Sequence, residues 1–297
     1  MPNPHTFAEL LQVMARLRDP DGGCPWDRAQ DFRSIVPHTL EEVCEVIDAI
    51  ERDDWAHLQE ELGDLLFQVV FYAQLGCERG LFDFPAIVDG LVAKLLARHP
   101  HVFPAGTLDS RRGADARVPD TRDVNRIWET VKEGERSARG GGPLGEIPAT
   151  LSALMRAAKM QKRAAHLGFD WPDATPVPAK IREELGEVEA AIAAGETAAI
   201  AEEIGDLLFA CVNLARHLGV DGEAALRGGN RKFEQRFARM LELVGGDVDA
   251  FRALSPEEKE ALWQAAKRTE RDPAASAAEY ATPAPRGAGV EAGGDSV

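Results

Sequence analysis

EELGDLL at residues 60–66 appears almost unchanged as EEIGDLL at residues 202–208. The match extends to both sides of the two stretches, because carboxylates recur in pairs separated by a constant 142 positions. The matched pairs are Glu42 with Glu184, Glu45 with Glu187, Glu61 with Glu203, and Asp64 with Asp206. A constant offset of this kind indicates internal duplication, so we expect two copies of one structural module.

A glycine-rich segment, EGERSARGGGPLGEIP at residues 133–148, separates the two copies. Its glycine run disfavours a helix and is typical of a flexible linker. The end of the chain is rich in Ala, Pro and Gly and has almost nothing to bury, which is typical of disorder. We therefore predict an N-terminal domain at residues 1–135, a linker at 136–147, a C-terminal domain at 148–272 and a disordered tail at 273–297.

Helical periodicity dominates both copies. Apolar residues recur at helical spacing in two stretches that precede and include the first acidic heptad. The positions are Leu40, Val43, Ile47 and Ile50, followed by Leu58, Leu62, Leu65 and Val69. Alternating β-branched runs bounded by turns are scarce, so we predict an all-α fold with a small helical bundle in each copy. The short segments DDWAHLQ and AAGETAA then join long helices that we expect to be antiparallel.

Composition excludes several classes of protein. The chain has an apolar fraction of 44%, and its formal net charge is −16. Such an acidic surface repels DNA, RNA and anionic lipid, so nucleic acid is not an expected partner. We find neither a signal-peptide pattern nor 18 consecutive apolar residues, and we expect no membrane association and a cytoplasmic location. The four scattered cysteines indicate reduced thiols that pack in the fold.

The helix that contains each acidic heptad places carboxylates in an unusual setting. At 100° per residue, Glu61, Asp64 and Gln68 share one narrow stripe that large apolar residues border on both sides. In the second copy, the corresponding stripe contains Glu203, Asp206 and Asn213. A solvated helix face is normally wide and mixed in charge, whereas this one is thin and anionic. Carboxylates are seldom placed among core residues without a cation.

The preceding helix of each copy adds an E-x-x-E pair, Glu42 with Glu45 and Glu184 with Glu187. Alone, this pair is typical of a solvated surface. Combined with the recurring E-x-x-D stripe, it predicts that two antiparallel helices bring four carboxylates together, and four like charges at that distance require cations. Oxygen ligands without Cys or His favour Mg²⁺, with Mn²⁺ as a substitute. No His follows a Glu by three residues, which argues against a di-iron bundle.

Mg²⁺ held by a few carboxylates keeps open positions for phosphate oxygens, so hydrolysis of a polyphosphate is the expected reaction. Two later motifs suit this reaction. Lys232 and Arg236 lie one helical turn apart, as do Trp263 and Lys267, and both spacings recur in the first copy. The cations would bind phosphate and the indole would stack on a base, although the same pattern is also typical of ordinary surface and core residues.

Several motifs together resemble the MazG family of nucleoside triphosphate pyrophosphohydrolases. They are EExxE followed by ExxGDLLF in both copies, GCPWD near the start, RHPHVF, GFDW and NLARHLG. The resemblance covers residues 7 to about 270. It implies an all-α homodimer that uses Mg²⁺ and cleaves between the α- and β-phosphates of many nucleoside triphosphates, releasing a monophosphate and pyrophosphate.

The resemblance also implies roles for individual residues of the second copy, to which the family's activity is generally ascribed. Metal ligands fall on Glu184, Glu187, Glu203 and Asp206, and nucleotide contacts fall on Lys180, Glu202, Lys232, Arg236, Trp263 and Lys267. The first copy has His38 at the position of Lys180, and neutral histidine is a weaker phosphate partner. The general base is not assigned. A narrower dUTP, dCTP or phosphoribosyl-ATP pyrophosphohydrolase and a non-catalytic helical scaffold are the alternatives.

Overall fold

A computed structural model describes residues 5–113 and 147–271, together with residues 120, 123–124, 127–128, 131, 134, 142 and 144–145. The chain divides into two compact units, Met1–Gly140 and Gly141–Val297, which we call the first and second units. All regular structure in the described residues is α-helical, so the predicted fold class is confirmed. The predicted tail and most of the predicted linker lie outside the described residues.

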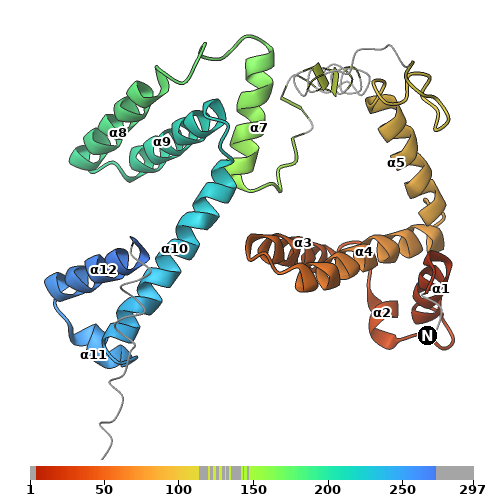
Figure 1. Cartoon of the computed structure of the whole chain (residues 1–297), viewed down its shortest axis with the longest axis horizontal. Helices are drawn as coiled ribbons and strands as arrows, with labels where there is room; N and C mark the ends of the chain where they lie inside the picture. Colours follow the sequence, from red (N-terminus) through yellow and green to blue (C-terminus); the bar gives the residue numbers. More distant parts are fainter. Residues whose placement is uncertain are drawn as a thin grey trace, which may run out of the picture. The chain divides into compact units, whose positions relative to one another are not determined.

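Within residues 5–113, the first unit has five helices (Figure 1): α1 (Phe7–Leu17), α2 (Pro25–Ala29), α3 (Val36–Glu51), α4 (Trp55–Glu78) and α5 (Phe84–Arg98). The long helices α3 and α4 form an antiparallel hairpin. Its turn contains Asp53, which has a positive φ of 56°, and Asp54, whose side chain accepts a hydrogen bond from the His57 N–H and so caps α4. Aspartate tolerates both roles, which explains the sharp reversal after α3.

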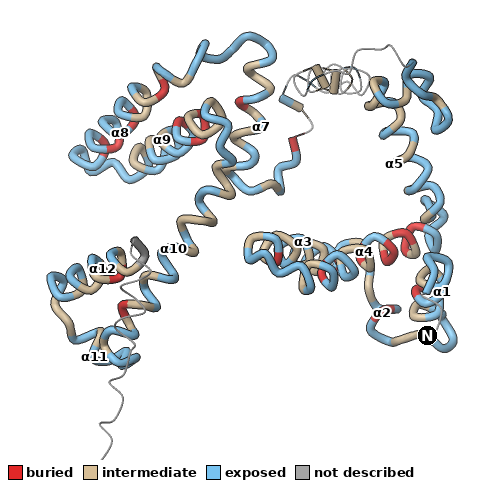
Figure 2. Tube along the Cα trace, in the orientation of Figure 1, coloured by how far each residue is buried: buried red, intermediate tan, exposed pale blue. Residues whose placement is uncertain are grey.

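The core of the first unit lies where α1 crosses the C-terminal half of α4. It consists of Met14, Ile35, Val70, Phe71 and Leu75, each at most 2% exposed. Figure 2 shows these buried positions gathered near the end of α4 that adjoins α1. The hairpin formed by α3 and the N-terminal half of α4 therefore extends away from the principal core.

Within residues 147–271, the second unit has six helices: α7 (Ala153–His166), α8 (Val177–Ala194), α9 (Thr197–His217), α10 (Gly222–Leu243), α11 (Val248–Ala253) and α12 (Pro256–Arg271). Helices α8 and α9 form a hairpin like that of α3 and α4, and α7 packs against α9. Gly195 ends α8 in the left-handed conformation with φ of 73°, which a residue with a Cβ adopts less readily. Helix α12 packs against α10.

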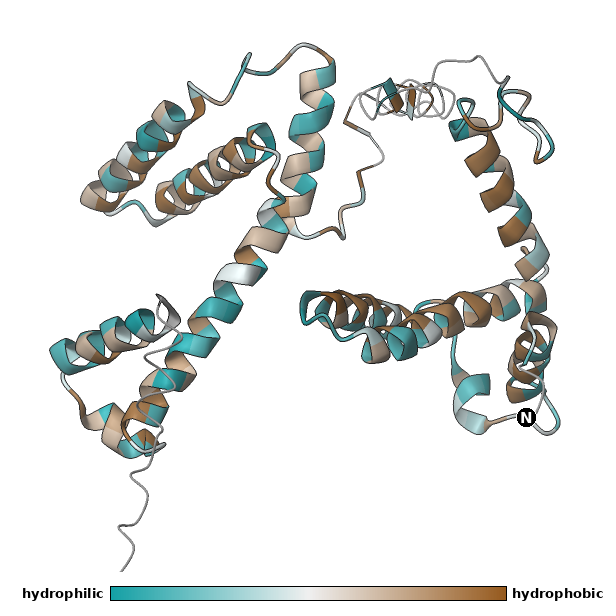
Figure 3. Cartoon of the chain, viewed as in Figure 1, coloured by the Kyte–Doolittle hydropathy of each residue, from teal (hydrophilic) through white to brown (hydrophobic). Residues whose placement is uncertain are grey.

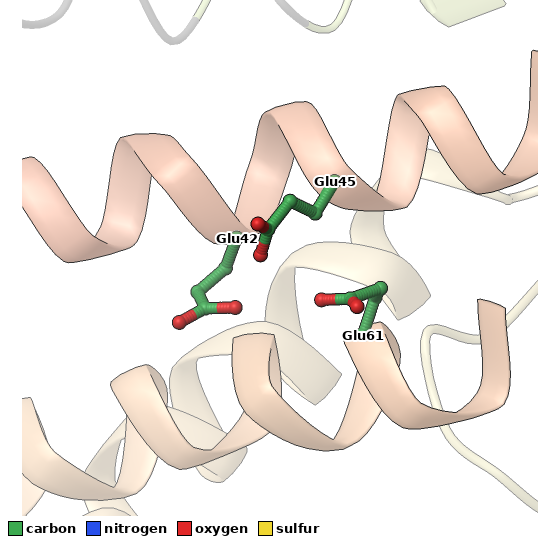
Figure 4. Close-up of side chains that lie close together, drawn as sticks. All are labelled: Glu42, Glu45 and Glu61. Atoms are coloured by element: carbon green, nitrogen blue, oxygen red, sulfur yellow. The ribbon is translucent and has the colours of Figure 1, made fainter. Parts of the chain in front are cut away.

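The apolar stripe of α3 faces outward in the described chain. Leu40 is 65% exposed and Ile50 is 47% exposed, whereas Ala49 on another face of the helix is fully buried. Glu42 is half-buried. The face of α3 that carries Glu42 and Glu45, a pair that alone is typical of a solvated surface, therefore turns toward α4 (Figure 4). Figure 3 shows that hydrophobic residues occur along the whole length of α3 and α4. None of the described helices combines the length and apolar character that crossing a membrane requires.

Candidate active site

The hairpin of the first unit brings three carboxylates together (Figure 4). Glu42 and Glu45 project from α3 toward Glu61 on α4, and each of them offers an oxygen within 4.8 Å of the other two. Glu42 and Glu45 lie nearly one turn apart, and the antiparallel pairing of the helices places Glu61 opposite them. We call these residues the first acidic cluster.

Burial and mutual repulsion alter the protonation of the first acidic cluster. Burial raises the pKa of Glu42, and the charges of Asp64 and Glu45 raise it further. Burial also raises the pKa of Glu61, with Glu45 adding to the rise. His57 Nε2 lies 3.1 Å from Glu61 Oε1 and partly opposes this rise. Burial and the close approach of like charges thus disfavour the ionised forms of Glu42 and Glu61.

The second hairpin repeats the arrangement with Glu184 and Glu187 on α8 and Glu203 on α9. Their oxygens also approach within 4.8 Å of one another, and we call them the second acidic cluster. Hydrogen bonding to Glu184 raises the pKa of Glu187, and burial and the charge of Glu203 add to the rise. Two carboxylates held this close repel each other, which favours the protonated form of Glu187.

Lys180 distinguishes the second cluster from the first. Its Nζ lies 2.7 Å from Glu184 Oε1 and 2.7 Å from Glu183 Oε1. The hydrogen bond from Lys180 lowers the pKa of Glu184, while bonds to Glu183 and Glu184 raise the pKa of Lys180 itself. The first unit has His38 at this position, and its ring contacts Glu41 at 3.8 Å instead.

The fourth predicted carboxylate of each copy lies beside its cluster and not within it. Asp64 and Asp206 are both exposed, and neither belongs to the groups of three oxygens within 4.8 Å. Each follows the glutamate of its helix by three residues, so it lies about one turn further along the same face. Asp206 lines the pocket described next. Glu202 is exposed on α9.

A pocket of about 610 Å³ opens next to the second acidic cluster. Lys180, Glu184 and Asp206 line one part of it. Other lining residues lie further along the helices or in the loop between α7 and α8: Met160, Gln161, Phe169, Asp170, Trp171, Phe209, Ala210, Asn213 and Arg216. The volume falls within the range of pockets that bind small molecules and cofactors.

A network of ionic hydrogen bonds holds the α7–α8 loop against α9. Arg216 Nη2 donates to Asp170 Oδ1 at 2.5 Å and to Asn213 Oδ1 at 3.0 Å, and His217 Nε2 lies 3.0 Å from Asp170 Oδ1. Burial acts to raise the pKa of Asp170, but the hydrogen bonds from Arg216 and His217 outweigh it and leave the pKa lowered. The neighbouring Trp171 is thereby held at the pocket wall.

The later basic and aromatic residues form a separate group on α10 and α12. The Arg236 guanidinium lies 5.3 Å from the centre of the Trp263 ring, and the Lys267 ammonium lies 5.8 Å from it. Trp263 also packs against Phe233 at 5.7 Å between ring centres. None of these residues, nor Lys232, lines the pocket. In Figure 1, α12 lies beside the C-terminal half of α10, apart from α8 and α9.

Several pocket residues were not singled out from the sequence as site residues. Phe169, Asp170 and Trp171 belong to the GFDW motif, and Asn213 and Arg216 belong to NLARHLG. Helical periodicity placed Asn213 on the stripe of Glu203 and Asp206, but no periodicity shows that the loop before α8 meets this face of α9. One sequence signal for the pocket was missed: the matched positions 71 and 213 differ, with Phe71 in the first copy and Asn213 in the second.

Known proteins resemble this chain in sequence. The chain is 48% identical over 274 residues to the nucleoside triphosphate pyrophosphohydrolase of Escherichia coli strain K12. The alignment covers 89% of this chain and 97% of that protein. The chain belongs to the MazG family. It is also 40% identical to the nucleoside triphosphate pyrophosphohydrolase/pyrophosphatase MazG of Thermotoga maritima, over 88% of this chain and 95% of that protein. The MazG nucleotide pyrophosphohydrolase domain matches residues 30–103 and 176–240.

The two MazG segments coincide with the two hairpins and their acidic clusters. The first segment spans α3 to α5, and the second spans α8, α9 and most of α10. Trp263 and Lys267 on α12 lie outside both segments. The predicted family and the predicted duplication are therefore both confirmed.

Proposed function

We propose that this MazG protein is a Mg²⁺-dependent nucleoside triphosphate pyrophosphohydrolase whose active site is the second acidic cluster with its adjoining pocket. The observation that carries the proposal is the convergence of Glu184, Glu187 and Glu203 within 4.8 Å, beside a lysine and a cavity of about 610 Å³. Hydrolysis would yield a nucleoside monophosphate and pyrophosphate, in agreement with the names of the relatives from Escherichia coli and Thermotoga maritima.

The donor set of the second acidic cluster suits a hard divalent cation. All of its ligand atoms are carboxylate oxygens. Mg²⁺ and Mn²⁺ prefer such oxygen ligands, whereas Zn²⁺ prefers Cys and His. The repulsion that raises the pKa of Glu187 beside Glu184 and Glu203 is what a bound cation would relieve. We propose that Glu184, Glu187 and Glu203 hold the ion, with Asp206 as a further ligand from the next turn of α9. When bound, the ion would polarise the phosphates and lower the pKa of a water.

The remaining groups of the site have separate roles. Lys180 would move from Glu183 to a phosphate oxygen, which its flexible side chain permits. Water would add to phosphorus at the α–β anhydride, the bridging P–O bond would break, and pyrophosphate would leave. A carboxylate of the site would accept the proton of the attacking water. Glu202 borders this site on α9.

The first acidic cluster offers the same type of donor set. We propose that Glu42, Glu45, Glu61 and Asp64 also bind a divalent cation. His57 contacts Glu61 there, and His38 replaces the phosphate-binding lysine. The first unit would therefore bind a triphosphate with a histidine in place of a lysine beside the ion. Because neutral histidine is the weaker phosphate partner, we assign turnover to the second unit.

We also propose a homodimer that covers the outward apolar faces of the hairpins. Matched positions of both copies are exposed, including Val43 with Leu185 and Leu62 with Ile204. Gly205, in the middle of α9, would meet nothing in the chain if it had a Cβ. Glycine in a helix interior costs about 1 kcal/mol relative to alanine, and close approach of another helix is a reason to keep it. A second copy would also be the source of Lys232, Arg236, Trp263 and Lys267 as nucleotide contacts.

Product analysis tests the enzymatic proposal. Purified protein with Mg²⁺ and a panel of ribo- and deoxyribonucleoside triphosphates should release pyrophosphate and the monophosphate. Glu203→Gln should abolish the release, whereas Glu189→Gln, on an exposed position of α8 outside the cluster, should not. Release of orthophosphate, or Mg²⁺-independent turnover, would contradict the proposal. Absence of any turnover would favour a helical scaffold.

Mass measurement in solution tests the dimer. Light scattering should give twice the mass of the chain, and Ile204→Lys should reduce it to a single chain. A wild-type protein with the mass of a single chain would contradict the proposed dimer. A mixture of Glu203→Gln and Lys232→Ala chains should regain activity if each site combines residues from two copies.

A further inference from the structure

The first acidic cluster has a nitrogen donor beside it, and the matched position of the second unit has none. His57 lies in the first turn of α4, four residues before Glu61, and its backbone N–H donates to the side chain of Asp54. The constant offset of 142 positions matches His57 with Ala199, whose methyl group cannot bind a metal. The two hairpins therefore share their carboxylates and differ in this imidazole.

The distance between His57 and Glu61 is that of two ligands on one ion. His57 Nε2 lies 3.1 Å from Glu61 Oε1. Two donors that each lie about 2.1 Å from one ion, at an angle of about 90–110°, are separated by about 3.0–3.4 Å. Glu61 also offers an oxygen within 4.8 Å of oxygens of Glu42 and Glu45 (Figure 4). An ion held by the three carboxylates would thus have an imidazole beside it as a fourth ligand.

The other ring nitrogen of His57 also faces a carboxylate. Its Nδ1 lies 3.8 Å from Glu60 Oε2. A histidine that binds a metal through one nitrogen commonly directs the other nitrogen toward a carboxylate, which orients the ring and makes the ligating nitrogen more basic. Glu60 is exposed and Glu61 is buried, so the ring of His57 lies between an outer carboxylate and the cluster.

A buried amide on the same face of α4 gives a second observation that points to a bound cation. Gln68 is 5% exposed, and its Nε2 lies 3.4 Å from Glu42 Oε1. Its Oε1 is buried and has no hydrogen-bond partner among the residues that the structure describes. Buried amide oxygens normally accept a hydrogen bond. Half a turn of the amide would direct Oε1 toward Glu42, where a cation or a water bound to it would satisfy this oxygen.

An imidazole ligand changes which cation the first acidic cluster prefers. Mg²⁺ selects oxygen ligands, whereas imidazole suits Zn²⁺ and other transition metals. Three carboxylates and one imidazole also supply the four protein ligands of a closed tetrahedral site. Resting on the cation site proposed above for the first unit, we propose that the first acidic cluster together with His57 binds Zn²⁺ or another divalent transition metal in preference to Mg²⁺.

The position of the site gives this ion a structural role. The ion would join α3 to the N-terminal half of α4, in the part of the hairpin that extends away from the core of the first unit. A ligand that binds only the folded state stabilises it. One chain would then hold two kinds of divalent cation, one that joins two helices of the first unit and one that serves hydrolysis in the second.

Metal titration of the full chain tests the inference. Glu203→Gln is the background, because it removes a carboxylate from the second acidic cluster and leaves the first one intact. Calorimetry at pH 7.5, without nucleotide, should show that Zn²⁺ binds this chain at least 100-fold more tightly than Mg²⁺. Adding His57→Ala should weaken Zn²⁺ binding at least tenfold and change the affinity for Mg²⁺ less than twofold. Zn²⁺ should also raise the thermal unfolding midpoint less in that variant.

His5→Ala is the matched control in the same background. His5 forms the same kind of i,i+4 pair, with Nδ1 3.8 Å from Glu9 Oε2, but its side chain is 94% exposed. Its removal should leave both affinities unchanged. An equal loss of Zn²⁺ binding in His5→Ala would show adventitious binding to surface histidines and would overturn the inference. Alanine favours a helix and His57 is partly exposed, so His57→Ala should retain the fold, which circular dichroism verifies.

The remaining outcomes separate this inference from the enzymatic proposal. Equal Zn²⁺ affinity with and without His57, or equal affinity of the background chain for Zn²⁺ and Mg²⁺, would overturn the inference and leave pyrophosphate release by the second unit unaffected. A background chain that binds no divalent cation would overturn it together with the proposed cation site of the first unit. Wild-type protein that binds Zn²⁺ as expected but releases no pyrophosphate with Mg²⁺ would overturn only the enzymatic proposal.

Discussion

Lys180 Nζ lies 2.7 Å from Glu184 Oε1, one turn away on α8. The contact neutralises part of the second acidic cluster and places an ammonium group at the edge of the pocket. The first unit has no equivalent contact among its described residues, because His38 takes the place of the lysine and lies near Glu41. The two copies therefore have similar carboxylates but different cations.

Lys180→His should copy this difference into the second unit. A charged hydrogen bond to phosphate contributes about 1.5–3 kcal/mol, so kcat/KM for ATP should fall about 10- to 100-fold at pH 8.5, where histidine is neutral. Lys159→His, at an exposed position of α7, is the control and should have no effect. Steady-state kinetics with pyrophosphate detection measure both variants. An unchanged kcat/KM for Lys180→His would remove the lysine from the phosphate site.

Asp206→Asn should raise the Mg²⁺ concentration needed for half-maximal activity at least tenfold. Asp206 is exposed, so the loss of its charge should leave the thermal unfolding midpoint unchanged. Metal titrations of activity, together with calorimetric binding of Mg²⁺, measure the effect. Asp89→Asn, on an exposed position of α5, is the control. Equal metal affinity in wild type and Asp206→Asn would show that the three glutamates suffice.

Phe71→Ala should destabilise the first unit by about 3–5 kcal/mol, because it removes a fully buried aromatic ring from the core. Leu81→Ala, at a site that is 64% exposed, should cost far less. Urea unfolding followed by circular dichroism compares the two variants. Nucleotide hydrolysis by Phe71→Ala should persist at urea concentrations where only the first unit unfolds. Loss of activity together with that first transition would place the first unit in the catalytic machinery.

The tether of Asp170 should respond to acid. The pKa of Asp170 is lowered in the folded protein, so its contribution to stability is fully present above its ordinary value of 3.8 and is lost as pH falls below that value. Asp170→Asn should therefore destabilise the second unit by about 1 kcal/mol at pH 7 and by much less near pH 3. Urea midpoints of both proteins at the two pH values measure this. An equal difference at both pH values would contradict the ionic tether.

Periodicity and repetition in the sequence were sufficient to predict the helical fold and the duplication. Apolar residues at helical spacing, such as Leu58, Leu62 and Leu65, predict a helix, and a constant offset of 142 positions can be recognised without a structure. The carboxylate pairs were likewise predictable. Glu42 and Glu45 share a face because of helical geometry, and Glu61 is brought opposite them by a short antiparallel turn.

Tertiary packing decided which face of each helix is covered and where space remains. The stripe of Leu40 and Ile50 has the pattern of a core, yet it faces outward, because burial depends on what lies across from a helix and not on its own periodicity. Phe71 is fully buried in the core of the first unit, whereas Asn213, at the matching position of the second unit, lines a pocket of about 610 Å³. Volumes and contacts between segments far apart in the chain arise only when the helices are packed together.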